Sequence, residues 1–215
     1  MLGQSITRNS VLLAVFAVIT TMLIAGTYLQ TRDRIALEQR KAEEKALLEI
    51  VPRERHDNSM LDDTIPIAAG AAGLGLREDK NIYVARKGPE AIAVIIPVTA
   101  PDGYSGDIDM IVGINADGTV AGVRALQHKE TPGLGDKVDL NKSDWILDFT
   151  GRSLENPTLP GWAVKKDKGI FDQFTGATIT PRAVVAATVR ALEYARNEHD
   201  RLYAPRALDT VAGEP

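Results

Sequence analysis

The sequence predicts an α+β fold, an antiparallel sheet with packed helices, preceded by one N-terminal transmembrane helix. Three observations support this: an uncharged stretch near the N-terminus, short β-rich runs separated by turn residues in the middle, and a run with helical periodicity near the C-terminus. The expected segments are a short tail at 1–10, the span at 11–30, a juxtamembrane helix or stalk at 31–52, the α+β domain at 53–200 and a loose tail at 201–215.

The membrane span rests on Val11 to Leu29, which contain no charged residue over 19 positions. That length is close to the ~20 apolar residues that cross a bilayer. The alternative is a cleaved signal peptide, whose apolar core usually has ~7–15 residues and ends in a small-x-small site. The run is longer than that, and Ala25-Gly26-Thr27 is only a weak cleavage site, so the sequence favours an uncleaved anchor.

Two segments connect the span to the β-rich region. Asp33 to Ile50 is rich in Ala, Leu, Glu, Lys and Arg and predicts a helix that ends before Pro52. Residues 53–80 look irregular. Gly73-Leu74-Gly75 in that region predicts a loop rather than a dinucleotide fingerprint, because Glu78 stands where the third glycine would be needed.

The β pattern occupies residues 81–127. Gly88-Pro89 separates the first two runs, and the sequence Asp117-Gly118 between the last two is a strong hairpin signal. Pro97 indicates an edge or a strand end, and Trp162 to Val164 could supply a further strand. The four runs are Asn81–Lys87, Ala91–Val98, Asp107–Asn115 and Thr119–Gln127. In the third run, alternate positions are apolar on one face: Ile108, Met110, Val112 and Ile114.

Two helices are expected after the strands, at Leu140 to Phe149 and at Pro181 to Glu198. For the second, Thr180 can serve as N-cap, and Pro181 suits the first helical position because its missing N–H has no helical partner there. The N-terminus of a helix leaves N–H groups unpaired and carries a positive dipole end. A phosphate attached to Thr178 would therefore lie at a favourable anion site.

The most informative motif is Asp172-Gln173-Phe174-Thr175-Gly176-Ala177-Thr178, directly ahead of that helix. It resembles the flavinylation motif of the FMN-binding domains of the Rnf and Na⁺-NQR respiratory complexes. The resemblance implies FMN joined to Thr178 by a phosphoester, with Thr175, Gly176, Ala177 and Thr180 around it. Without the resemblance, the same residues would be an ordinary turn and a capped helix.

A second flavin-site segment is implied in the loop from His128 to Lys137. Glu130 and Thr131 offer polar groups and Leu134 offers an apolar contact, the combination that a flavin ring needs. The run Glu-Thr-Pro-Gly-Leu-Gly in this loop is similar to the flavin-site loop of the same family; otherwise it would be a surface turn. Gly103-Tyr104-Ser105-Gly106 also matches the family, as a turn that starts a strand.

Composition excludes several kinds of site. The chain has no cysteine, so disulfides, thiolate catalysis and ordinary iron–sulfur ligation are excluded. Residues 31–215 carry a net charge of −5, which argues against a nucleic-acid-binding surface. The three histidines have no metal-ligand spacing, and no catalytic acid or base stands out. Trp145 and Trp162 are interpreted as packing residues.

The resemblance is closest to the G subunit of Rnf, across residues 103–137 and 162–190. It implies a single-pass protein of the bacterial inner membrane, with its soluble domain facing the periplasm. It also implies electron relay through covalent FMN in an Rnf-type ion-translocating ferredoxin:NAD⁺ oxidoreductase, with the other subunits as partners and a separate flavin transferase for maturation. The alternatives are the C subunit of Na⁺-NQR, a membrane-anchored binding or assembly module without redox activity, and a secreted enzyme released by signal cleavage.

Overall fold

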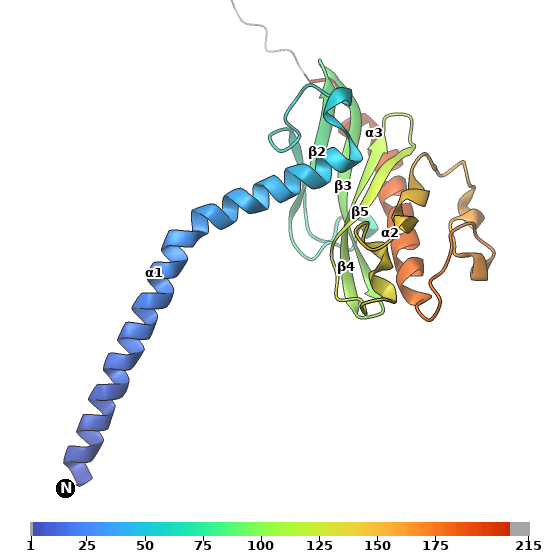
Figure 1. Ribbon diagram of the computed structural model, residues 1–215. Helices are drawn as coiled ribbons and strands as arrows, with labels where there is room; N and C mark the ends of the chain where they lie inside the picture. The colour runs from blue at the N-terminus through green and yellow to red at the C-terminus, as the bar shows by residue number, and fades with distance from the viewer. Residues whose placement is uncertain (1, 207–215) are drawn as a thin grey trace, which may run out of the picture. The chain divides into compact units, whose positions relative to one another are not determined.

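The computed structural model describes residues 2–206 and contains one five-stranded antiparallel sheet. Each strand pairs with the next along the chain, so the strand order is β1-β2-β3-β4-β5 (Figure 1). Together with the helices, this confirms the predicted α+β class. The strands are β1 (Thr64–Ile67), β2 (Lys80–Lys87), β3 (Glu90–Gly103), β4 (Gly106–Asn115) and β5 (Val120–Gln127).

The N-terminal segment forms a single helix, α1 (Leu2–Ile50), which includes the helix predicted at Asp33 to Ile50. Its apolar part is long and apolar enough to cross a membrane, judged by length and composition alone. Three hydroxyls in it bond to carbonyls four residues earlier: Thr20 to Phe16 at 2.7 Å, Thr27 to Leu23 at 2.7 Å and Thr31 to Thr27 at 2.8 Å. Such bonds satisfy hydroxyl groups where water is absent.

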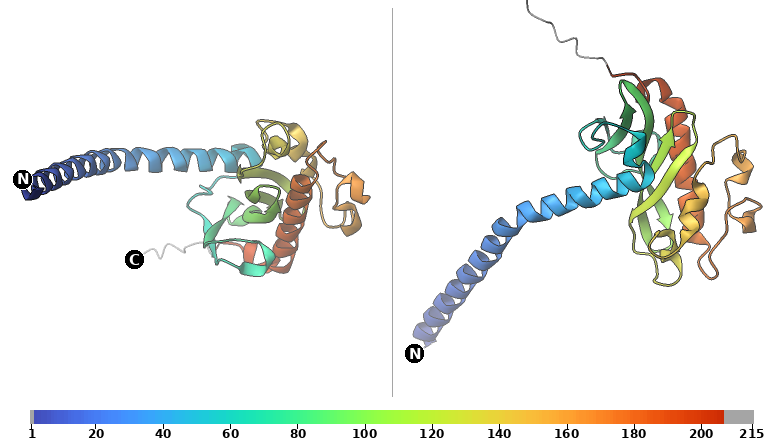
Figure 2. Two further views of the ribbon diagram at one scale, coloured as in Figure 1. Left: turned by 90° about the horizontal axis from the view of Figure 1, so that it is seen from below. Right: turned by 45° about the horizontal axis from the view of Figure 1, so that its top comes forward.

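The chain divides into two compact units, residues 1–45 and 46–215. The main core of the second unit lies between the sheet and α2 (Ile179–Asn197), which crosses one face of the sheet (Figures 1 and 2). The alternation predicted in the third run is confirmed, because all four of its apolar residues are buried in this core. They are Ile108, Met110, Val112 and Ile114.

The opposite face of the sheet is covered by the last turn of α1 and the residues after it. Leu47, Ile50 and Val51 are buried there against apolar residues of β2, β3 and β4. Ile50 packs directly on Gly113, because a Cβ added to Gly113 would lie 2.2 Å from Cγ2 of Ile50. The compact domain therefore begins at residue 46, ahead of the boundary predicted at residue 52.

The segment between β5 and α2 is built of short 3₁₀ helices, and two predictions for it were wrong. The helix predicted from Leu140 is only a 3₁₀ helix that begins at Asp144, because Asn141 N–H bonds to the Asp139 carboxylate at 2.9 Å and Ser143 caps the shorter element. The strand predicted at Trp162 to Val164 is a single bridge from Val164 to Phe171. The short helices are η3 (Gly135–Val138), η4 (Asp144–Phe149), η5 (Leu159–Gly161) and η6 (Lys165–Asp167).

Three further details correct the expectations. Residues 53–80 contain β1 as well as η1 (Arg53–Arg55) and η2 (Ala71–Gly73), so the region is not wholly irregular. Pro97 does not end β3. The pairing of β3 with β2 stops at Ile95, so Pro97, which has no N–H group, is not required to donate a hydrogen bond to β2. In α3 (His199–Leu202), Leu202 is fully buried, so the packed part of the chain extends past residue 200; residues 207–215 lie outside the described part of the chain.

Candidate functional site

The motif ahead of α2 folds as a tight turn on the aromatic core. Phe174 is buried, and its carbonyl accepts a hydrogen bond from Ala177 N–H at 3.1 Å. Gly176 has φ of +81°, a value that residues with a Cβ rarely adopt. Thr175 and Gly176 are exposed, and Ala177 is half-buried. The turn therefore places the end of the motif at the surface, where α2 begins.

Thr178 is the residue that immediately precedes α2. It has φ −77° and ψ −25° and is half-buried. Its side chain makes no capping hydrogen bond, and its carbonyl accepts the Arg182 N–H at 3.4 Å. The hydroxyl is thus left unused by the helix, beside N–H groups that have no helical partner. A hydroxyl in this position can carry a phosphate at the positive end of the helix dipole.

Thr180 is not the N-cap, so that prediction was wrong. The helix begins at Ile179, and Thr180 is its fully buried second residue. Its Oγ1 donates a hydrogen bond to Oε2 of Glu130, 50 residues earlier. Pro181 occupies the third helical position, where it still costs no helical hydrogen bond. The Thr180 hydroxyl therefore donates to the Glu130 carboxylate instead of capping the helix.

Glu130 connects three segments of the site. Its side chain is 5% exposed, and its Oε1 accepts a hydrogen bond from Ser105 N–H at 2.9 Å. The same carboxylate accepts from Thr180, so the turn at 103–106, the loop at 128–134 and the start of α2 meet at one group. Gly135 makes room for this contact, since an added Cβ would lie 2.6 Å from Glu130 Oε2 and 2.8 Å from Thr180 Oγ1.

The other two residues predicted in the loop are at the surface. Leu134 is exposed, and its Cδ2 lies 3.7 Å from the position that a Cβ on Gly176 would occupy. The loop and the motif are therefore neighbours, as a common site requires. Thr131 is exposed, and its carbonyl accepts the N–H groups of Leu134 and Gly135 at 3.1 Å each. Its contribution in the described structure is to shape the loop, and its part in holding a flavin stays a prediction.

Asp136 lies in the loop predicted to contact the flavin, although no feature of the sequence distinguished it from its neighbours. It is 9% exposed, and within residues 2–206 its Oδ1 has no hydrogen-bond partner. A buried carboxylate oxygen without a donor is costly unless a further group supplies one. FMN offers such donors in its ribityl hydroxyls and its ring N–H, and Thr178 and Leu134 offer a phosphate anchor and an apolar contact. The residues present therefore fit this cofactor.

Two ion pairs border the motif. Arg182 contacts Asp167 through two hydrogen bonds of 2.6 and 2.7 Å, and these bonds lower the pKa of the Asp167 carboxyl. Lys165 pairs with Asp172, the first residue of the motif, at 2.6 Å. The charge of Arg182 is thus already paired, and the two bridges tie η6 to both ends of the motif.

The two tryptophans pack in the aromatic core next to the motif, and Trp145 contacts the motif itself. Trp145 Nε1 donates to the Asp172 carbonyl at 2.8 Å, and its ring meets Phe174 edge-on with centroids 5.0 Å apart. Trp162 and Phe171 lie 5.3 Å apart, and the Trp162 Nε1 reaches the Ser153 and Pro157 carbonyls at 3.0 and 3.1 Å. Both indoles are 7% exposed, in agreement with a packing role.

Comparison with known proteins identifies the family. Residues 103–193 match the FMN-binding domain, and residues 1–50 match the RnfG N-terminal region. The G subunit of the ion-translocating oxidoreductase complex of Pseudomonas aeruginosa is 50% identical over 94% of both chains. The chain belongs to this G-subunit family. Its members also include the G subunit from Pseudoalteromonas atlantica, 48% identical over 91% of both chains, and that from Vibrio cholerae, 43% identical over 93% of this chain and 94% of the relative.

The match to the FMN-binding domain spans every segment of the candidate site, from the turn at Gly103 to Glu193 in α2. FMN is accordingly the cofactor that the family membership supports. Among solved structures, NqrC of Shewanella oneidensis is similar over 66% of each chain, with 23% identity and a TM-score of 0.43. That likeness is too distant for a residue-by-residue comparison of the sites.

Proposed function

We propose that this protein carries FMN on Thr178 through a phosphoester and relays electrons within an Rnf-type ion-translocating ferredoxin:NAD⁺ oxidoreductase. The observation that carries the proposal is the hydroxyl of half-buried Thr178, which makes no cap bond and stands immediately ahead of α2. Membership of the G-subunit family and the FMN-binding match support the cofactor and the complex. The remaining subunits of such a complex are its proposed partners.

Attachment of the cofactor requires little from this chain. A flavin transferase would bring FAD; the Thr178 oxygen would attack the FMN phosphorus, the bond to AMP would break and the hydroxyl would lose its proton. Thr178 needs only to be reachable, and its side chain makes no capping hydrogen bond that would have to break. The free N–H groups at the start of α2 would then face the phosphate, where its charge is most favourable.

The chain's own residues would next hold the cofactor in position. FMN supplies the chemistry, because a flavin can accept and donate electrons singly. Asp136 Oδ1 would accept a hydrogen bond from it, and Leu134 would cover apolar surface next to Gly176. Glu130 already accepts from Thr180 and Ser105, so we assign it to the positioning of the loop rather than to direct chemistry. A covalent tether also keeps the cofactor at high local concentration near its redox partners.

The location of the protein is part of the same proposal. We propose that α1 spans the bacterial inner membrane once, through residues 11–30, and that the FMN domain faces the periplasm. Within residues 2–206, one helix is long and apolar enough to span a membrane, which supports an anchor. A tether is useful outside the cytoplasm, because a cofactor that dissociated there would be lost by diffusion.

The decisive experiment is an intact mass of the full chain before and after treatment with a flavin transferase and FAD. We expect a gain of one FMN, mapped by peptide analysis to the segment from Thr175 to Thr180. The same chain treated without FAD is the control. An unmodified mass after treatment of a folded protein would reject the covalent site and would favour a membrane-anchored module without redox activity.

A further inference from the structure

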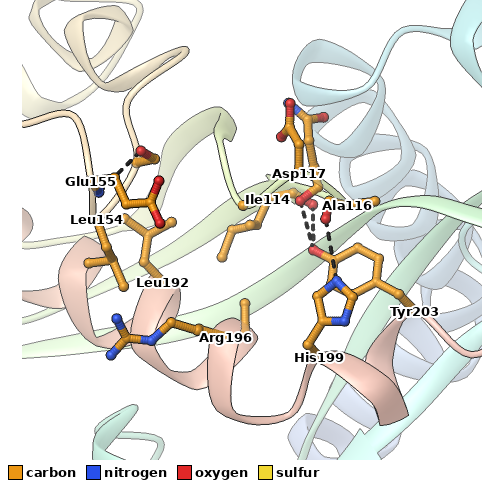
Figure 3. A pocket seen from close by; sticks show the side chains of 13 residues that line it. Ile114, Ala116, Asp117, Leu154, Glu155, Leu192, Arg196, His199 and Tyr203 are labelled. Atoms are coloured by element: carbon orange, nitrogen blue, oxygen red, sulfur yellow. Dashed lines mark hydrogen bonds between the residues drawn. The ribbon is translucent and has the colours of Figure 1, made fainter.

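A second cavity lies at the other end of α2. It has a volume of about 310 Å³ and opens between the β4–β5 turn, the segment 153–155 and the last turn of α2 (Figure 3). With 19 residues and a rise of ~1.5 Å per residue, α2 is roughly 28 Å long, so this cavity is separate from Thr178. Nothing in the proposed flavin site uses it.

The floor of the cavity is apolar. Ile114, Leu192 and Ala195 line it and are at most 3% exposed, and half-buried Leu154 completes it. Because the first three are already almost fully buried, the apolar surface left for a ligand to cover is mainly that of Leu154, and covering it removes it from water. The volume is at the lower end of the range for small-ligand sites, ~300–1,000 Å³, which suits a compact molecule.

One wall is a rigid aromatic pair. The rings of His199 and Tyr203 are stacked with centroids 4.7 Å apart. The Tyr203 hydroxyl lies 3.0 Å from the Ile114 carbonyl oxygen and 3.2 Å from that of Asn115, and His199 Nε2 lies 3.3 Å from the Ala116 carbonyl oxygen. These contacts fix both side chains to the end of β4, so the cavity has a preformed wall.

The rim carries two charges of opposite sign that have no ion-pair partner within residues 2–206. They are Arg196 on α2 and Glu155 on the facing segment, both exposed. In Figure 3, Leu154 and Leu192 lie between them. The third charged side chain, Asp117, is already engaged, because its carboxylate accepts Thr119 N–H at 3.0 Å and Thr119 Oγ1 at 2.6 Å.

We propose that this cavity binds a small zwitterion with an apolar body, the chemical class of the free apolar α-amino acids. The carboxylate pairs with the Arg196 guanidinium, the ammonium group pairs with the Glu155 carboxylate, and the apolar side chain covers the floor. A ligand with one charge leaves the other rim charge unpaired, so both charges together select for a zwitterion.

The test is calorimetric titration of the full chain in detergent with L-phenylalanine, phenethylamine and 3-phenylpropionate. The last two lack the carboxylate and the ammonium group respectively. We expect saturable binding of L-phenylalanine and affinities about tenfold lower for each analogue, the usual effect of one lost charge-assisted hydrogen bond. Arg196→Gln should lower the affinity for L-phenylalanine to that for phenethylamine and leave the affinity for phenethylamine unchanged. Glu155→Gln should lower the affinity for L-phenylalanine to that for 3-phenylpropionate and leave the affinity for 3-phenylpropionate unchanged.

The matched control is Lys87→Gln, which removes an exposed cation at the end of β2 without touching the cavity. No saturable binding of L-phenylalanine or L-leucine would overturn the proposal, as would equal affinities for the three ligands or rim variants that behave like the control. Thr178→Ala should bind L-phenylalanine as the native chain does. Failure at the cavity and failure of flavin attachment are therefore separately visible.

Discussion

The two ends of α2 face the same sheet but organise their polar groups differently. At the N-terminal end, the Thr180 hydroxyl bonds to the buried Glu130 carboxylate, and the Thr178 hydroxyl nearby is left without a capping bond. At the C-terminal end, Tyr203 and His199 bond to backbone carbonyls at the end of β4.

The difference has a physical consequence. Removing the Thr180 hydroxyl would leave Oε2 of the buried Glu130 carboxylate without its hydrogen-bond donor, which destabilises the folded state. Removing the Tyr203 hydroxyl would leave carbonyl oxygens near an open cavity, where water can replace the lost donor. We therefore expect loss of the buried Thr180 contact to lower stability more than loss of the Tyr203 contact. Four substitutions test this comparison.

The largest effect is expected for Thr178→Ala. It should abolish covalent flavin, because the only attachment oxygen in the proposal is removed, while the free energy of unfolding changes by no more than about 0.5 kcal/mol, as for an ordinary surface substitution. Flavin fluorescence on a denaturing gel measures the first quantity, and thermal unfolding measures the second. Thr158→Ala, which removes an exposed hydroxyl outside the motif, is the control. Full fluorescence in the Thr178 variant would exclude this residue as the carrier.

Thr180→Val should have the largest effect on stability. It keeps the side-chain shape but leaves Glu130 Oε2 buried without its donor, so we expect a loss of about 1–3 kcal/mol in the free energy of unfolding. Denaturant unfolding in detergent measures this loss, and covalent flavin should still form.

A double-mutant cycle shows whether that loss comes from the contact itself. Combined with Glu130→Gln, Thr180→Val should show a coupling energy above about 0.5 kcal/mol. Thr131→Val, at an exposed position of the same loop, should change stability by less than about 0.5 kcal/mol. If the Thr131 and Thr180 variants proved equally stable, the buried contact would not be contributing.

Tyr203→Phe should cost about 1 kcal/mol at neutral pH, the value of a typical hydrogen bond. Burial, and secondarily the charge of Asp117, raises the pKa of Tyr203 far above its ordinary value of 10.0. The folded state therefore keeps the phenol proton after the unfolded chain begins to lose it, so this contribution is present below pH about 10 and falls as the pH rises further. Thermal unfolding between pH 7 and 11 should show a smaller alkaline loss in the variant than in the native chain; parallel curves would contradict the role of this phenol.

The smallest effect is expected for Asp117→Asn. Hydrogen bonds from Thr119 lower the pKa of the Asp117 carboxyl from its ordinary value of 3.8. The contribution of Asp117 to the free energy of unfolding is therefore present above pH 3.8 and is lost as the pH falls below it. The native chain should lose more stability than the variant between pH 5 and about 2, measured by thermal unfolding. Asp102→Asn, at an exposed position in β3, serves as the comparison.

Much of the fold could be predicted because it depends on local patterns. The run ending in Asn115, the Asp117-Gly118 turn and the following run form the predicted β4–β5 hairpin, since alternation and turn chemistry are encoded within a few residues. The helix after the motif was placed within two residues of its observed start. The segment from Leu140 to Phe149 was misjudged because Asx and serine turns compete there with helical hydrogen bonds.

The candidate site was predicted less completely, and Thr180 and Asp136 explain why. A threonine before proline has two possible partners, its own helix or a distant acceptor, and only the approach of Glu130 decides between them. Asp136 has no distinguishing feature in the sequence, because burial of its carboxylate arises from η3 and its surroundings. The contact between Ile50 and Gly113 was not predicted either, because the two residues are 63 positions apart and no local pattern connects them.

The amino-acid sequence by itself determined the apolar anchor, the alternation of the strands and the seven-residue motif that ends at Thr178, because each depends on neighbours along the chain. The tertiary structure alone decided that Thr178 keeps a hydroxyl without a capping bond, that Thr180 gives its hydroxyl to Glu130, and that a charged rim surrounds an apolar cavity at the far end of α2. Those outcomes depend on which distant groups the packed sheet brings within hydrogen-bonding reach, and no local pattern specifies that distance.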